Sequence, residues 1–539
     1  MRLIVEGFSL GLIDSNIITR MGLARPQEGL SREEITLPKC PAIDINAVEF
    51  FPKNAIGKMR GRESLQSAPW VNSAIIRLYQ WRSESLVDYS LVFSCVSGVG
   101  ASASIARISK LSGPMTFEPV VASAASLSAW SPTVSGDMID ICSFGGSAIM
   151  TYGGANMPLA VYIGGLSIEP LGGTGAPSGV KAIAGWGSYL FAGNILDGSV
   201  RYASRVRWCQ PLVPTNWPTW SYIDLDPMDG DEIKAMWLLG NILVVFKKYK
   251  TFIIKYVGGV LEFDWERIDA SIGCVGCNAL TECDGVIYFI SADGFYAYDG
   301  TRPPYEVDAN IKGLTYDVYP DLDTTFEVDY YDNDQMFFTV ANGTAIRKNR
   351  VYVYDTELKN WSKWDAEIAG IGSINYGAAE RYVDFPLTYE EYSLRIGDAK
   401  GLKDTIFTFG SYDGFLHKYG NTLNDLGSAI EASWTSPWID FGYPDRNKRI
   451  LRVYIYVEGT DDVHTISFDG FVDWNSYVPV VTKTFTTQAT DRQIAEKRLD
   501  FTQACRAFQF RLTSEELNSQ VVIHKVIIDF LIKGRTITS

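Results

Sequence analysis

Short runs of alternating hydrophobic and polar residues recur along most of the chain and predict β-strands joined by tight turns. Residues 284–300, DGVIYFISADGFYAYDG, are typical of this pattern. Two apolar runs flank a Ser-Ala-Asp-Gly link, and the Asp-Gly pair predicts a hairpin. Because helical periodicity is almost absent from the sequence, the pattern predicts an all-β protein.

Hairpin units of this kind start about 45 to 60 residues apart, a spacing that suits the four-stranded blades of a β-propeller. One hairpin cannot bury both of its faces, whereas blades packed around an axis can. The sequence therefore predicts a β-propeller of six or seven blades within residues 71–430. The units cover residues 71–109, 137–154, 180–194, 232–259, 278–300, 324–365 and 404–421.

The pattern changes near Glu431, where longer alternating strands with charged outward positions begin. Such strands predict a C-terminal β-sandwich over residues 431–539. Residues 1–70 are irregular and polar, and we interpret them as an N-terminal arm or tethering segment. Glu6 and Asp14 interrupt the first apolar stretch, so we expect neither a signal peptide nor a transmembrane helix there.

A five-residue motif, Ser-x-Asp-Gly-Phe, occurs three times and is similar to part of the Asp-box of sialidases. Asp and Gly favour a turn, Ser can cap it through a local hydrogen bond, and Phe can bury the returning strand. We therefore predict a structural hairpin at each copy. The copies are Ser291, Asp293, Gly294 and Phe295; Ser411, Asp413, Gly414 and Phe415; and Ser467, Asp469, Gly470 and Phe471.

Two stretches match parts of motifs that carry chemistry. Residues 7–11, GFSLG, match a nucleophile elbow, but that motif needs a helix after its serine and we expect none here. Cys274 and Cys277 have the spacing of half a zinc site without a second pair, so we expect them in the core. The sequence therefore predicts no catalytic, cofactor-binding or metal-binding residue.

An acidic segment precedes one of the hairpin units. Its spacing differs from that of a calcium loop, because Met228 stands where an oxygen ligand is needed. We predict a turn between strands and hypothesise that its acids line part of a channel. The formal net charge of −15 disfavours electrostatic binding of nucleic acid. The acids are Asp224, Asp226, Asp229, Asp231 and Glu232.

Four stretches together resemble the tail nozzle and tail-hub proteins of short-tailed bacteriophages, also called packaged-DNA stabilisation proteins. They are residues 45–65, 199–256, 272–301 and 350–365. The resemblance implies a structural protein of the virion tail, not an enzyme and without a cofactor, assembled in the host cytoplasm as a homo-oligomer, expected to be a hexamer.

The same resemblance implies what such a ring would contact. It would lie below the portal and adaptor ring, help to retain the packaged genome and anchor tail fibres, spikes or a needle. Double-stranded DNA would pass through it at ejection without tight binding, since an acidic wall repels the DNA backbone.

Two other classes of function remain open. The first is a receptor- or glycan-binding propeller protein of a phage tail, with a carbohydrate-binding sandwich at its C-terminus. Exposed aromatic residues would serve it, and the candidates lie in NWPTW (216–220) and NWSKW (360–364), although paired aromatics more often pack between blades. The second is an enzyme of the sialidase or hydrolase kind.

Overall fold

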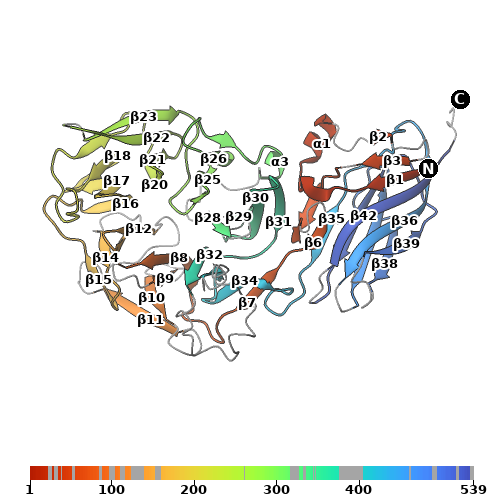
Figure 1. Cartoon of the computed structure of the whole chain (residues 1–539), viewed down its shortest axis with the longest axis horizontal. Helices are drawn as coiled ribbons and strands as arrows, with labels where there is room; N and C mark the ends of the chain where they lie inside the picture. The colour runs from red at the N-terminus through yellow and green to blue at the C-terminus, as the bar shows by residue number, and fades with distance from the viewer. Residues whose placement is uncertain are drawn as a thin grey trace, which may run out of the picture.

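The computed structural model shows a β-propeller beside a β-sandwich, which confirms the predicted all-β fold class (Figure 1). Among the residues described, no helix is long and apolar enough to cross a membrane. The structure describes residues 1–21, 27–28, 34–37, 39–50, 55–83, 88–95, 103–109, 116–122, 139–151, 159–259, 262–315, 327–331, 335–343, 345, 347–375, 405–459, 463–487, 494–517 and 521–533.

The described part of the propeller comprises seven blades of four strands each, and the first strand of every blade borders a cavity on the axis. The first three blades contain β8 (Ala74–Arg82), β9 (Asp88–Cys95), β10 (Ala103–Ser109) and β11 (Thr116–Ala122); β12 (Asp140–Phe144), β13 (Ser147–Thr151), β14 (Ala160–Tyr162) and β15 (Ser167–Pro170); and β16 (Gly179–Trp186), β17 (Tyr189–Asp197), β18 (Val200–Trp208) and β19 (Tyr222–Asp224).

The remaining four blades continue the ring. They contain β20 (Ile233–Leu239), β21 (Ile242–Lys247), β22 (Thr251–Gly258) and β23 (Glu262–Asp269); β24 (Leu280–Cys283), β25 (Val286–Ser291), β26 (Gly294–Tyr298) and β27 (Tyr305–Glu306); β28 (Glu327–Tyr331), β29 (Gln335–Val340), β30 (Arg350–Asp355) and β31 (Asn360–Trp364); and β32 (Gly370–Asn375), β33 (Thr405–Gly410), β34 (Leu416–Thr422) and β7 (Gly61–Ser64).

Two strand pairings depart from a simple succession of separate four-stranded blades. The outer strands β11 and β15 pair in parallel, so the first two blades form one eight-stranded sheet. The N-terminal strand β7 pairs antiparallel with β34 and completes the last blade. Arg62 on β7 donates two hydrogen bonds to the carboxylate of Asp425, both of 2.7 Å. The ring is thus closed by a segment from the opposite end of the propeller sequence.

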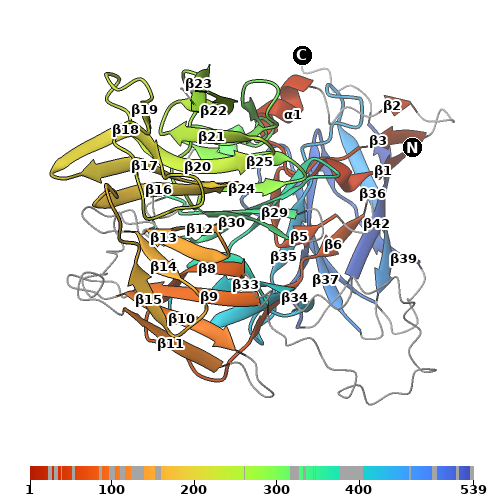
Figure 2. The same ribbon diagram turned by 60° about the vertical axis from the view of Figure 1, so that its left-hand side comes forward.

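The sandwich consists of two sheets, and the N-terminal segment contributes strands to both (Figure 2). In the first sheet, β1 pairs in parallel with β3 and antiparallel with β42. That sheet contains β1 (Arg2–Val5), β2 (Gln27–Glu28), β3 (Glu34–Leu37), β5 (Val48–Glu49), β6 (Ile56–Lys58), β36 (Lys448–Gly459), β39 (Ala495–Asp500), β40 (Ala504–Cys505) and β42 (Val521–Ile532); the second contains β4 (Asp44–Asn46), β35 (Ala432–Thr435), β37 (Thr465–Val472), β38 (Val481–Thr486) and β41 (Phe508–Ser514).

The N-terminal segment also fixes the sandwich to the outer edge of the sixth blade. The amides of Leu12 and Ala47 donate to the carbonyls of Trp361 and Lys363 on β31, each at 2.8 Å. One hydrophobic core runs from the sandwich into the fourth, fifth and sixth blades. Because the sandwich lies beside the ring (Figure 1), it does not lie across the propeller axis.

Short helical elements occur near the N-terminus and after the fifth blade. Phe8–Leu10 forms the 3-10 helix η1, which is followed by α1 (Ser15–Met21), and α3 spans Lys312–Thr315. The expectation that no helix follows residues 7–11 was therefore wrong. Because α1 is only two turns long, it is too short to show a clear helical periodicity beside the hairpin pattern that follows it.

The three copies of the Ser-x-Asp-Gly-Phe motif lie in different settings. Ser291–Phe295 forms the turn between β25 and β26, and Ser411–Phe415 forms the turn between β33 and β34. At the second copy, Ser411 Oγ accepts hydrogen bonds from the amides of Asp413 and Phe415. The third copy, Ser467–Phe471, lies inside strand β37, so the predicted hairpin there was wrong. Pairing with both β38 and β41 keeps this copy extended.

Candidate functional site on the propeller axis

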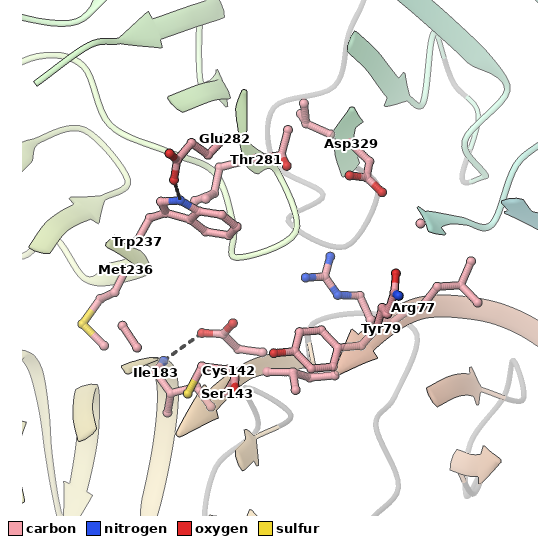
Figure 3. A pocket seen from close by; sticks show the side chains of 18 of the residues that line it. Arg77, Tyr79, Cys142, Ser143, Ile183, Met236, Trp237, Thr281, Glu282 and Asp329 are labelled. Carbon is pink, nitrogen blue, oxygen red and sulfur yellow. Dashed lines mark hydrogen bonds between the residues drawn. The ribbon is translucent and has the colours of Figure 1, made fainter. Parts of the chain in front are cut away.

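A cavity of about 440 Å³ lies on the axis of the propeller (Figure 3). The first strands of all seven blades line it, namely β8, β12, β16, β20, β24, β28 and β32. In a propeller these strands converge, so residues far apart in sequence can face one space. A concave site with a few converging polar groups is the usual form of a ligand site.

Three carboxyl groups from three different blades line the axial cavity. Asp140 begins β12, Glu282 lies on β24 and Asp329 lies on β28. The backbone amide of Ile183 donates to Asp140 Oδ2 at 2.8 Å, and the amide of Tyr330 donates to Asp329 Oδ1 at 2.8 Å. These bonds fix the orientation of two of the carboxyl groups.

Burial gives two of these groups a higher proton affinity than an ordinary aspartate has. Burial raises the pKa of Asp140 to about 7, although backbone hydrogen bonds and the charge of Arg77 oppose the shift. Burial also raises the pKa of Asp329 to about 6; the Tyr330 amide and Arg77 oppose the shift, and the charge of Glu327 adds to it. Both groups can therefore exchange protons near neutral pH.

Arg77 on β8 projects into the axial cavity, which Glu282 and Asp329 also line (Figure 3). Among the described residues that line the cavity, Arg77 is the one with a basic side chain. Its Nη1 lies 3.8 Å from Oε1 of the buried Glu327, whose Oε2 accepts hydrogen bonds from Lys348 Nζ and the Ile371 amide. Its Nε is buried and has no hydrogen-bond partner in the described structure, as expected of a group that meets a ligand.

Aromatic side chains complete the wall of the cavity. The indole Nε1 of Trp237 on β20 donates to Glu282 Oε2 at 2.9 Å, which fixes both side chains (Figure 3). Tyr79 on β8 lies near Arg77, and burial raises the pKa of its phenol. The axial cavity thus combines carboxyl groups, a guanidinium and an indole.

The acidic segment singled out in the sequence lies elsewhere, at the link from β19 to β20, and none of its five acids lines the axial cavity. Basic groups or backbone amides hold all five. Asp224 pairs with Arg205, Asp226 with Arg267 and Lys250, and Asp229 with Lys247 and Lys250; Glu232 pairs with Lys181 and Lys234, and Asp231 accepts the amides of Lys248 and Tyr249. Their predicted place on a channel wall stays a prediction.

The aromatic and cysteine candidates lie mainly in the core. Trp217, Trp361 and Trp364 are buried, whereas Trp220 is exposed. Cys274 and Cys277 are buried, and burial raises the pKa of the Cys277 thiol well above its ordinary value. Among the described residues, no three His, Cys, Asp or Glu side chains form a group that could hold a metal ion.

No protein-family model and no curated protein matches the chain. Several solved structures match it. The extracellular domain of a hybrid two-component system from B. thetaiotaomicron is 11% identical over 76% of this chain and 46% of that one, with a TM-score of 0.39. A glycoside hydrolase is 10% identical over 87% of this chain and 100% of its own, with a TM-score of 0.27. An arabinoxylan arabinofuranohydrolase from Bacillus subtilis is 10% identical over 87% of this chain and 98% of its own, with a TM-score of 0.23.

These matches contradict the resemblance to phage tail nozzle proteins. The matching structures are glycoside hydrolases and a sensor's extracellular domain. The predicted family, the tail-nozzle function and the expected roles in the virion tail, the tail hub and DNA ejection were therefore wrong. The prediction that the chain is not an enzyme is contradicted by the same glycoside hydrolases. At these identities and TM-scores the matches carry no further conclusion about this chain.

Sequence reasoning missed Asp140, Glu282 and Asp329 as a group. Each stands in the first strand of a hairpin unit, within DMIDIC, NALTEC or FEVDYY. A carboxyl group in an otherwise apolar inner strand is the signal that could have identified them, because the inner strands of a propeller converge on the axis.

Proposed function

We propose that this protein binds a carbohydrate in the axial cavity and hydrolyses a glycosidic bond there. The observation that carries the proposal is the convergence of Asp140, Glu282 and Asp329 from three blades on one cavity. Glycoside hydrolysis requires a carboxylic acid and a carboxylate on either side of the scissile bond. Two acids with raised pKa values beside a fixed indole supply these parts.

The two raised pKa values suggest which residue performs which step. Asp140, with a pKa of about 7, holds a proton near neutral pH and can give it to the glycosidic oxygen as the bond to the anomeric carbon breaks. Asp329, with a pKa of about 6, is ionised above that pH and can take a proton from the attacking water. The water oxygen bonds to the anomeric carbon as its proton passes to Asp329, so each product carries a new hydroxyl group. Asp140 then regains a proton and Asp329 releases one, which restores both groups.

The other residues of the cavity fit substrate binding. The indole of Trp237, fixed by Glu282, offers an apolar face to a sugar ring. Arg77 can donate to sugar hydroxyls through its unpartnered Nε–H. Glu327 and Lys348 lie behind Arg77 and hold it toward the cavity.

The test is an assay of the purified protein against aryl glycosides of arabinofuranose, xylose, galactose and sialic acid, together with plant and microbial polysaccharides. We expect hydrolysis of at least one, with a bell-shaped dependence on pH and its maximum between about 6 and 7, where Asp329 is ionised and Asp140 is protonated. Asp140→Asn should remove general-acid catalysis, and with it the fall in rate above about pH 7, while leaving sugar binding in place.

A glycan-binding function without hydrolysis is the second candidate, and the unpartnered Arg77 Nε favours it equally. Binding of a glycan to the wild-type protein, lost in Arg77→Met and accompanied by no hydrolysis, would support that candidate against the hydrolase. Absence of both binding and hydrolysis across the panel would reject both.

A further inference from the structure

We propose that a second cavity, at the seam where the last blade closes, binds a neutral sugar or a similar polyol. This seam cavity has a volume of about 430 Å³. Its wall includes Arg62 from β7 and the Ser411–Phe415 turn between β33 and β34, followed by His417 on β34. It is separate from the axial cavity, and its occupation does not depend on chemistry at the axis.

His417 is the first sign that the seam cavity takes a ligand. Its side chain is 5% exposed, yet its Nδ1 has no hydrogen-bond partner in the described structure. Burial, together with the charge of Arg62, lowers the pKa of His417 to about 4, so the imidazole is neutral at physiological pH. A buried ring nitrogen without a partner is costly unless something in the cavity bonds to it.

The charges around the seam cavity argue against an ionic ligand. Arg62 is the one Lys or Arg among the described residues that line the seam cavity. Its guanidinium already has partners, because Nε and Nη2 donate to Asp425 and Nη1 donates to the carbonyl of Glu367. An anion would find no uncommitted cation there. The two lining carboxylates offer little to a buried cation, because Asp413 is exposed and Glu367 is mostly exposed and lies 3.6 Å from Arg347.

The polar groups that remain match the mixed hydrogen bonding of a sugar. Ser411 Oγ accepts two backbone amides and Tyr412 Oη accepts the amide of Lys348, so each hydroxyl keeps a hydrogen to donate. His417 Nδ1 and the carboxylate of Asp413 provide further partners. Phe415 stacks on His417 with an interplanar angle of 11°, which adds a flat apolar surface.

The same motif in the fifth blade provides a natural control. Ser291–Phe295 forms the equivalent turn between the second and third strands of its blade. There Phe295 is fully packed, with its ring centroid 4.7 Å from that of Phe338. Asp293 instead accepts a hydrogen bond from Tyr296. A motif shared by two turns therefore borders the seam cavity in one of them.

The experiment uses the full chain labelled with ¹⁵N-histidine, whose ring nitrogens report hydrogen bonding and protonation directly. The chain has three histidines, so His464 and His524 serve as internal references. Arabinose, xylose, galactose and inositol are titrated to roughly 100 mM, which reaches a site of millimolar affinity. We expect the His417 ring signals to shift with at least one of them while the two reference signals stay fixed.

Matched variants separate the seam site from general effects. Asp413→Ala should weaken the titration at least several-fold, whereas Asp293→Ala, in the equivalent turn, should leave it unchanged. Asp140→Asn should also leave it unchanged, so a failure of the axial hydrolase proposal would not affect this one. The proposal is overturned if no polyol moves the His417 signals, or if a phosphate or an alkyl ammonium ion moves them while polyols do not.

Discussion

Two groups of acidic residues in this propeller contain members whose pKa values are shifted in opposite directions. The acids of the β19–β20 link, Asp224 to Glu232, are adjacent in sequence and each is held by basic groups or backbone amides. The acids of the axial cavity come from three blades, and the charge of Arg77 acts on two of them, Asp140 and Asp329. The first group has lowered pKa values at Asp229 and Glu232, whereas the second has raised ones at Asp140 and Asp329.

The difference shows that a dense run of carboxylates is a poor guide to chemistry. Neighbouring acids on a turn can each recruit a Lys or Arg from an adjacent strand, and a paired carboxylate has no proton to give at neutral pH. A carboxyl group carried inward by a first strand loses water instead, and its proton affinity rises. The functional contrast between the two groups therefore comes from their surroundings.

The largest expected effect is on catalysis. If the axial cavity is the active site, Asp329→Asn should lower kcat/KM by about 10²- to 10⁴-fold, because the group that takes the proton from water is lost. Asn still accepts the Tyr330 amide, so the fold should be retained. The matched variant Glu232→Gln in the link should leave kcat/KM unchanged. Equal losses in both variants, measured by steady-state kinetics, would contradict the contrast.

The next effect concerns stability in the link. Lys247 is fully buried, and its Nζ bonds both carboxylate oxygens of Asp229 at 2.9 Å. Asp229→Ala would leave this ammonium without its counter-ion, at a cost of about 3 to 5 kcal/mol in the free energy of unfolding. Urea denaturation measures it.

A double variant checks the cause of that loss. Asp229→Ala combined with Lys247→Met removes both charges and should recover much of the lost stability. If the double variant is as unstable as the single one, packing of the Asp229 side chain, and not the isolated ammonium, explains the effect.

The third effect is a loss of stability at the axis as pH rises, which is opposite in sign to the effect expected of Glu232 in the link. The pKa of Asp140 is about 7 in the folded protein and near 3.8 when unfolded, so the folded state keeps a proton that the unfolded state releases. Stability should therefore fall as pH rises from about 4 to about 7, by at most about 4 kcal/mol. Asp140→Asn should remove this slope and be the more stable protein at pH 8. A variant slope equal to that of the wild type would refute the assignment.

The smallest effect is at Glu232. Burial opposes its ionisation, but the Lys234 hydrogen bond and the charges of Lys234 and Lys181 outweigh it and lower the pKa to about 2. The resulting stabilisation is present above pH 4.5 and is lost as pH falls through about 2. Because the side chain is about one-third exposed, Glu232→Gln should cost about 1 kcal/mol or less at pH 7. Thermal unfolding at pH 7 and pH 2 should show the difference only at pH 7.

The sequence by itself determined the repeated architecture. Alternation of apolar and polar residues gave strands, Asp-Gly turns gave hairpins at residues 291–295 and 411–415, and the spacing of the units gave a propeller followed by a sandwich. These properties are local, because a strand's period and a turn's φ preferences depend on a few adjacent residues.

Only the tertiary structure decided where the chemistry lies. The same Ser-x-Asp-Gly-Phe letters make a turn at Ser411 and a strand interior at Ser467, because pairing with two neighbouring strands overrides the local preference. Residues 1–58 contribute strands to a sandwich whose other strands lie after residue 431, a pairing that no local pattern encodes. Asp140, Glu282 and Asp329 meet because seven inner strands converge on one axis, and burial at that axis, which depends on every blade at once, sets the proton affinities of Asp140 and Asp329.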